Sequence, residues 1–197
     1  LVYESREEDP DIGGFTYVAT ENGLKIYENE NFIPMGFTYD YYVDQEALDA
    51  YNKSKRDVLM AAAIYLDDEA VVRNRDILAP LPEDHMPSLS DAGLAKLAQE
   101  RRQHTCKAFT RDNTGFTAEI DLDRENLVFF SVPYDKGFSA QVNGEDAVIE
   151  KANAGFMAVR VPAGSSTIRF TYQTPGLHLG MLATLGAAGG IACYILI

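Results

Sequence analysis

The sequence has few basic side chains. It holds 17 lysines and arginines against 30 aspartates and glutamates, which gives a formal net charge of −13 over 197 residues. Binding to nucleic acid needs clustered lysines and arginines against the phosphates, so the composition argues against a nucleic-acid partner. The same deficit argues against docking of the protein surface on anionic lipid headgroups. An acidic surface favours solubility and indicates no particular substrate.

Cysteine is equally scarce. Cys106 follows a charged segment and Cys193 lies in an apolar tail, so we expect no disulfide between them. Cysteine usage therefore indicates no particular compartment, and the lack of a disulfide is compatible with the exterior of a bacterial cell.

Motifs for catalysis and metal binding are missing. The three histidines, His85, His104 and His178, have no cysteine or carboxylate at metal-ligand spacing on a shared helix face, and there is no phosphate-binding glycine loop or nucleophile elbow. Asp121-Leu122-Asp123 resembles the DxD of some nucleotide-sugar transferases, but such triplets arise by chance among 30 acidic residues. We expect no catalytic residue, cofactor or metal in this chain.

What the sequence does contain is a long apolar segment at its C-terminus. Residues 177–197, LHLGMLATLGAAGGIACYILI, include no aspartate, glutamate, lysine or arginine. About 20 apolar residues span a bilayer core, so we expect a transmembrane helix over residues 176–197, following a β-rich domain over residues 1–175. The alternative is a helix buried in a soluble core. The start at Leu1, without methionine or a signal-like segment, suggests a piece of a longer protein.

Hydrophobic periodicity predicts strands, two helices, and strands again. The first strands are expected at 15–19, 24–27 and 37–43, with a turn at 21–23. Spacings of three, four and seven residues predict a helix near 45–66, capped by Asp44. A loop follows at 74–87, and a second helix, capped by Ser88, near 89–103.

The C-terminal half returns to a period of two residues. Alternation or continuous apolar runs predict strands at 117–122, 127–132, 138–142, 156–161 and 168–172. Five or six short strands with frequent turns indicate a β-sandwich. The expected fold class is α+β, mainly β: a jelly-roll-like β-sandwich with two helices inserted between N-terminal and C-terminal strands, followed by one transmembrane helix.

Two aromatic and polar stretches are candidates for sugar binding. One contains Tyr39 and Asp40, and the other contains Tyr134, Asp135 and Lys136. A tyrosine ring can stack on the apolar face of a sugar while a carboxylate accepts hydrogen bonds from its hydroxyls. The alternative is that the aromatic rings belong to strands of the core and that the charged residues lie in solvated turns.

Several segments resemble one family in the same order. Tyr27-Glu28-Asn29 followed by Pro34-Met35-Gly36-Phe37 is similar to the YEN…P-[LM]-G-F segment of YfhO-type bacterial membrane proteins. Residues 127–138, LVFFSVPYDKGF, resemble the family's LLLSIPYDKGW strand–turn–strand, with Phe138 where tryptophan is usual. Further likenesses lie at Val142-Asn143-Gly144, at residues 155–159 and at residues 172–180.

This resemblance implies a long parent protein with many membrane helices, similar to the GT-C class of glycosyltransferases. Such enzymes take a sugar from a polyprenyl-phosphate carrier and add it outside the cell, and family members are linked to glycosylation of lipoteichoic or wall teichoic acid. The catalytic acid of that class lies on an early extracytoplasmic loop that this sequence does not contain, so no residue here inherits a catalytic role.

The resemblance also implies a place and partners for the chain. We expect a domain on the extracytoplasmic face of the cell membrane. Its partners would be the remaining membrane helices of the parent, with a polyprenyl-phosphate sugar or teichoic acid as a further contact. Three hypotheses stay open: a non-catalytic ectodomain that covers the active site or holds the acceptor, a purely structural cap, and a sugar-binding module acting away from the catalytic centre.

Overall fold

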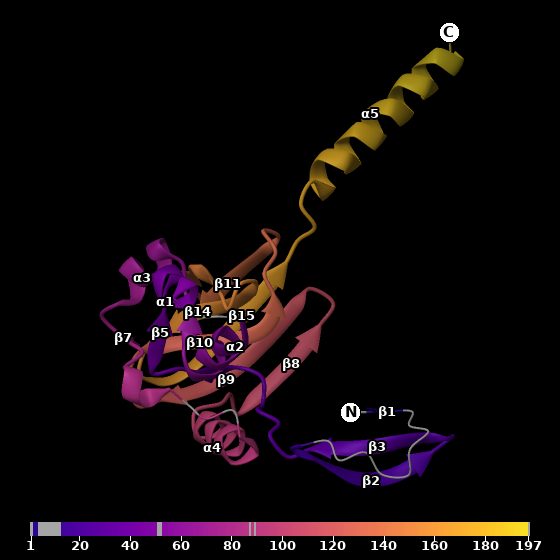
Figure 1. The fold of residues 1–197 in the computed structure, drawn as a ribbon. Helices are drawn as coiled ribbons and strands as arrows, with labels where there is room; N and C mark the ends of the chain where they lie inside the picture. Colours follow the sequence, from indigo (N-terminus) through magenta and orange to yellow (C-terminus); the bar gives the residue numbers. More distant parts are fainter. Residues whose placement is uncertain (1, 4–12, 51–52, 87, 89, 197) are drawn as a thin grey trace.

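Two antiparallel sheets packed face to face form the centre of the computed structural model, which describes residues 2–3, 13–50, 53–86, 88 and 90–196 (Figure 1). The β10 sheet has the order β13 (Ile149–Ala152), β14 (Phe156–Val161), β10 (Asn126–Pro133), β4 (Phe37–Thr38). The β15 sheet has the order β12 (Glu145–Ala147), β11 (Phe138–Val142), β15 (Gly164–Tyr172), β9 (Gly115–Leu122), β8 (Ala108–Asp112). The expected mainly β fold is therefore confirmed.

The strand order shows how the sandwich is closed. β15 lies between β9 and β11, and β14 lies between β10 and β13, so spatial neighbours are often distant in sequence. This interleaving is typical of Greek-key sandwiches. The Asn143-Gly144 turn joins β11 to β12 with both residues at positive φ, 54° and 85°, as a two-residue hairpin loop requires.

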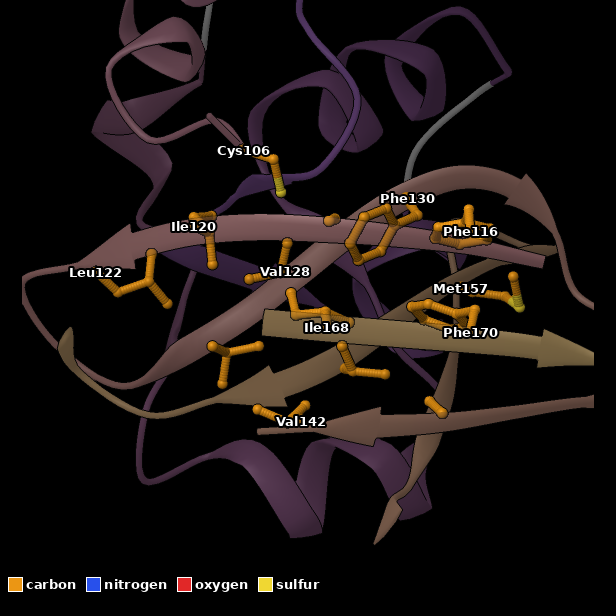
Figure 2. Packing of buried hydrophobic residues seen from close by; sticks show 14 residues of the cluster. Cys106, Phe116, Ile120, Leu122, Val128, Phe130, Val142, Met157, Ile168 and Phe170 are labelled. Atoms are coloured by element: carbon orange, nitrogen blue, oxygen red, sulfur yellow. The ribbon is translucent and has the colours of Figure 1, made fainter. Parts of the chain in front are cut away.

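The space between the two sheets is filled by apolar side chains that we call the inter-sheet core. Strand alternation brings them together, because every second residue of each strand points to the same face. Figure 2 shows Phe116, Phe130 and Phe170 close together in this core, and the Phe116 and Phe170 rings stack with centroids 4.6 Å apart. Its buried members are Cys106, Phe116, Ala118, Ile120, Leu122, Val128, Phe130, Ala140, Val142, Met157, Val159, Val161, Ile168 and Phe170.

The opposite face of the β10 sheet is covered by the helical segment. Here the chain forms α1 (Gln45–Asp49), α2 (Lys53–Ala62), α3 (Asp68–Asn74), the 3₁₀ turn η1 (Glu83–His85) and α4 (Asp91–Arg102), with a small parallel sheet of β6 (Ile64–Tyr65), β5 (Tyr41–Val43) and β7 (Ala79–Pro80). The buried residues between these elements and the β10 sheet form the helix-side core: Tyr39, Ile64, Leu66, Ala70, Leu78, Leu127, Phe129, Ala152 and Ala158.

Several expected boundaries in this segment were wrong. The helix expected near 45–66 is divided into α1 and α2 and gives way to β6, because Ile64 pairs with β5. Directly after the end of the expected helix, Asp67 accepts a hydrogen bond from the Ala70 amide at 2.8 Å and so starts a further helix, α3. The strand expected at 37–43 is divided between two sheets, and the loop expected at 74–87 includes β7 and η1.

The caps give one confirmation and one correction. Asp44 caps α1 as expected, by accepting from the Ala47 amide at 2.8 Å. Ser90, not Ser88, caps α4, and the Ser88 hydroxyl accepts a hydrogen bond from the Ser90 amide instead. Residues 51–52, 89 and 197, which fall within expected helices, lie outside the described residues.

A separate three-stranded sheet lies beside α4, away from the sandwich (Figure 1). It has the order β1 (Val2–Tyr3), β3 (Leu24–Asn29), β2 (Phe15–Glu21), and it contains the strands expected at 15–19 and 24–27. Arg102 of α4 holds the segment after β3, donating to the carbonyl oxygens of Glu30 and Phe32.

The chain ends in α5 (Leu177–Leu196), which projects from one end of the sandwich (Figure 1). By length and composition this helix can cross a membrane, with a mean hydropathy of 1.8. It is exposed along its described length, unlike a helix buried within a soluble core.

Candidate functional site

The end of the sandwich nearest α5, here called the membrane-proximal end, is fixed by the last strand. β15 ends at Tyr172, and α5 begins at Leu177. An extended chain covers at most about 3.6 Å per residue, so Tyr172 lies within roughly 18 Å of the first helical residue. The end of β15 and the loops bonded to it therefore lie close to the surface of any membrane that α5 crosses.

The turn of residues 134–137 is bonded directly to this strand end. The Gln173 amide donates to the Gly137 carbonyl oxygen at 2.9 Å. Within the turn, the Gly137 amide donates to Asp135 Oδ1 at 2.7 Å, and the Phe138 amide donates to the Asp135 carbonyl oxygen at 3.0 Å. A Cβ atom at Gly137 would lie 2.4 Å from the Gln173 carbonyl oxygen, so this approach requires glycine.

The side chains of this turn are available to a ligand. Tyr134 is 42% exposed, and its amide donates to the Gly155 carbonyl oxygen at 2.7 Å. Lys136 is exposed and forms no ion pair within the described part of the chain. One carboxylate oxygen of Asp135 holds the turn, which leaves the other for an outside donor. Aromatic face, carboxylate and ammonium can together contact a sugar or a phosphate.

The other expected stretch lies inside the protein. Tyr39 is 5% exposed and belongs to the helix-side core, where its hydroxyl donates to the Met60 carbonyl oxygen at 3.3 Å. Burial raises the pKa of Tyr39 above its usual value. Asp40 is exposed and paired with Arg124 at 2.6 Å. Both side chains are thus engaged within the protein, and their contact with a sugar stays a prediction.

The two stretches are connected without forming one open site. Asn153 Nδ2 donates to the Tyr39 hydroxyl at 3.2 Å, and the nearby Gly155 carbonyl oxygen accepts from the Tyr134 amide. The turn at residues 153–155 is thus bonded to the buried Tyr39 hydroxyl and to the backbone amide of the exposed Tyr134. Of the five expected residues, the structure brings Tyr134, Asp135 and Lys136 together.

A cavity of about 670 Å³ opens at the membrane-proximal end, beside Tyr172. Its walls are mainly apolar, formed by residues that include Phe109 and Phe138, with Arg111 and Asp112 also in the lining. The Arg169 guanidinium, which pairs with Asp112 at 2.6 Å, holds the pKa of that carboxyl well below its usual value. No local sequence pattern indicates this cavity, because its walls come from several turns and strands.

A charged cluster on the helix side was also missed. The buried Glu150 carboxylate accepts from Arg73 at 2.9 and 2.7 Å and from Asn74 at 2.9 Å, which attaches α3 to β13. Nearby, Arg160 pairs with Asp76 at 2.6 Å and with Glu125 at 2.7 Å. These partners lie at least 35 residues apart in the sequence, so no local spacing signals them.

One acidic residue of the DxD-like triplet has structural partners. Asp121, from the DxD-like triplet, accepts hydrogen bonds from Lys107 and Ser165, and the Lys107 ammonium lowers the pKa of its carboxyl. In the described ranges, no group of three or more histidine, cysteine, aspartate and glutamate side chains could hold a metal ion. The arrangement at the 134–137 turn is suited to binding.

A β-sandwich joined at one end to a helix that can cross a membrane defines the class: a membrane-anchored, mainly β protein. The family model described as bacterial membrane protein YfhO matches residues 79–184, more than half of the chain. The chain therefore belongs to the YfhO family of bacterial membrane proteins, as the sequence motifs indicated. The matched region includes the 134–137 turn and the start of α5, but not Tyr39 or Asp40.

One curated relative supports this assignment. The chain is 28% identical over 69 residues to the uncharacterized protein YfhO of Bacillus subtilis (strain 168). The aligned part is 35% of this chain and 8% of the relative, so the chain spans only a small part of that protein's length. No solved structure matches the chain significantly.

Proposed function

We propose that this chain is the extracytoplasmic, non-catalytic part of a membrane glycosyltransferase, one that transfers sugar from a polyprenyl-phosphate carrier to a cell-envelope polymer such as teichoic acid. Membership of a bacterial membrane protein family supports the membrane setting. The observation that carries the proposal is the hydrogen bond between Gln173 and Gly137. It places the exposed Tyr134, Asp135 and Lys136 beside the chain that continues into α5.

In this role the 134–137 turn contacts the substrate at the membrane surface. The Lys136 ammonium pairs with a phosphate oxygen of the carrier or of a glycerol-phosphate acceptor, and Asp135 and Tyr134 contact a sugar. Because the chain has a net charge of −13, its surface repels a long anionic polymer. The contact with the polymer is therefore confined to the 134–137 turn.

The test uses the full-length parent in its own bacterium. The double variant Asp135→Ala/Lys136→Ala should lower the sugar content of the extracted envelope polymer while the protein remains at normal abundance in the membrane. The matched control is Lys96→Ala/Glu100→Ala, which also removes one cation and one anion, from an exposed pair on α4. Equal sugar content in the two variants would contradict the substrate contact.

The second candidate is a structural ectodomain, favoured by the internal bonding of Tyr39 and Asp40. It predicts that the turn variants leave the envelope sugar unchanged and that core substitutions lower the abundance of the parent. NMR titration of the full chain in detergent, with glycerol phosphate and simple sugars, distinguishes a sugar-binding module from a structural ectodomain. Amide shifts confined to residues 134–137 would support binding at the turn.

The extracytoplasmic orientation has its own test. A cysteine introduced at the exposed Glu145, in a parent otherwise free of reactive cysteines, should react in intact cells with a maleimide that does not cross the membrane. Cys106 serves as an internal control, because burial raises the pKa of its thiol to about 12 and leaves almost no thiolate to react. Labelling of Glu145→Cys only after cell lysis would reverse the proposed orientation.

A further inference from the structure

A second cavity, of about 290 Å³, lies between α4, the β2–β3 hairpin and the helix-side core. Its walls are largely apolar and include Phe37, Leu94 and Leu97. Two amides, Asn29 and Asn31, line it from the hairpin side. The volume is at the lower end of the range for small-molecule sites.

One buried cation also lines this cavity. Arg101 is only 8% exposed, so its guanidinium is almost fully removed from water. Among the described residues, its guanidinium donates one hydrogen bond, from Nη2 to the Ala62 carbonyl oxygen at 2.6 Å, and its Cζ atom lies 4.4 Å from the centroid of the Tyr39 ring. The Nε–H group is buried without an acceptor among the described residues.

Two acidic side chains of the described residues act electrostatically on Arg101, and both have other partners. Asp40 is exposed and paired with Arg124, and Glu100 is exposed and within reach of Lys96. Burial lowers the pKa of Arg101, yet arginine keeps its proton in proteins. Arg101 therefore has no counter-ion of its own among the described residues. A buried charge that lacks a counter-ion is costly, and a ligand that supplies one removes much of that cost.

We propose that this cavity binds a small amphiphilic anion, whose carboxylate or phosphate group pairs with Arg101 and whose apolar part lies against Phe37, Leu94 and Leu97. An oxyanion fits because it accepts a charge-assisted hydrogen bond from the guanidinium, whose Nε–H group has no acceptor among the described residues. The Tyr39 ring packs on the guanidinium and fixes its plane, so the donor is positioned before the ligand arrives. This site is separate from the 134–137 turn and does not depend on the proposed sugar transfer.

Binding at this position would also stiffen the attachment of the hairpin. Arg102, the next residue of α4, already holds the segment after β3 through the carbonyl oxygens of Glu30 and Phe32. A ligand between Arg101 and the hairpin adds a second connection between the same two elements. The two adjacent arginines thus have different roles. Arg101 lines the cavity, and Arg102 holds the segment after β3 in place.

The test follows the Arg101 side chain in the full 197-residue chain, ¹⁵N-labelled, in non-ionic detergent. Hexanoate and hexyl phosphate are the probes, and neutral hexanamide is the control. One or both anions should shift the Arg101 Nε–Hε resonance to saturation, and hexanamide should not. A shift with hexanoate alone would identify the ligand group as a carboxylate, and a shift with hexyl phosphate alone would identify it as a phosphate. The proposal is overturned if neither anion shifts the resonance up to about 10 mM, or if hexanamide shifts it equally.

Two variants make the result specific. Arg101→Met, followed through the side-chain amide of Asn31 in the same cavity, should weaken anion binding roughly tenfold or more, because it removes a charge-assisted hydrogen bond. Leu94→Trp fills the apolar wall, keeps the cation, and should abolish binding even if Arg101→Met fails to fold. Lys96→Ala, on the exposed side of the same helix, should bind as the wild type does. Unchanged affinity in Leu94→Trp would place any bound anion outside this cavity.

Discussion

Strand β10 separates two cores of different character. Its Val128 and Phe130 side chains enter the inter-sheet core, whereas Leu127 and Phe129 enter the helix-side core. The inter-sheet core has no buried charged side chain among the described residues, whereas Glu150 and Arg101 are buried on the helix side. The first is held mainly by apolar contacts, whereas the second also contains buried charges that need particular polar partners.

The difference teaches where specificity and function reside in this protein. Apolar layers stabilise the sandwich and can be built from many combinations of side chains of suitable volume. Buried charges need particular partners: Glu150 attaches one element to another, and Arg101 is the proposed binding group for an anion. Mutations in the two cores should therefore differ in size and kind.

The largest effect is expected in the inter-sheet core. Phe130 is fully buried, so Phe130→Ala should lower the free energy of unfolding by about 3–5 kcal/mol through lost burial and a cavity. Urea unfolding of the full chain in detergent measures this. Phe32→Ala, at a side chain that is 61% exposed, should change it by less than about 0.5 kcal/mol. Similar values for both variants would contradict the assignment of Phe130 to the core.

The next effect is an asymmetry on the helix side. Arg73→Met leaves the buried Glu150 carboxylate with Asn74 alone, which should cost about 3 kcal/mol. Glu150→Gln leaves Arg73, which is 44% exposed and can be hydrated, and should cost only about 1 kcal/mol. Unfolding of both variants, with the exposed Arg75→Met as control, tests this order. A larger cost for Glu150→Gln would show that Arg73 depends on its partner.

A smaller, pH-dependent effect is expected at the membrane-proximal end. Arg169 and Thr114 hold the pKa of Asp112 below its usual value. The pair therefore stabilises the fold above the unfolded pKa of about 4, and its contribution is lost as the pH falls through the lower folded pKa. The difference in Tm between wild type and Arg169→Met should be constant from pH 7 to about 5 and shrink below pH 4. A difference that grows on acidification would contradict this pairing.

The smallest effect is expected at the surface pair of Asp40 and Arg124. Both side chains are more than half exposed, so solvent screens their attraction and a double-mutant cycle of Asp40→Asn and Arg124→Met should give less than about 1 kcal/mol. A coupling above about 2 kcal/mol would show that this pair resembles the buried cluster.

The inter-sheet core was the more predictable half of the fold. β9, β11 and β15 alternate apolar and polar residues, and β10 is apolar on both faces, so their positions followed from the sequence. The helix-side elements were misassigned because tertiary contacts decide them. Ile64 and Tyr65 continue a helical pattern but pair with β5, and Asp67 can end one helix or start another.

The candidate site was predictable only in part. The motif at residues 134–137 could be recognised in the amino-acid sequence, but its position beside Gln173 depends on the strand order. Tyr39 was chosen by its residue type, and its burial could not be read from a stretch in which every residue is aromatic or polar. Arg101 lies in the last turn of α4, where a basic residue is ordinary, and only the packing shows that it lines a cavity.

The structure explains why residue 36, in the PMGF segment that resembles the YfhO motif, is a glycine. Gly36 has a φ of 78°, and a Cβ there would lie 2.3 Å from the Cys106 sulfur and 2.9 Å from the Phe130 ring. Its carbonyl oxygen accepts from the Cys106 amide at 2.7 Å. The motif therefore marks where the connection into the sandwich passes closest to the inter-sheet core.

The connection between β15 and α5 has a mechanical consequence. β15 is an interior strand, paired with β9 on one side and β11 on the other, and it continues through a short connection into the helix (Figure 1). A pull or twist applied to the helix by the lipid or by neighbouring helices acts first on this strand, and two ladders of hydrogen bonds share the load. Because β15 is hydrogen-bonded to β9 and β11, a force on the helix must break bonds on both sides of the strand before the strand can leave the sheet.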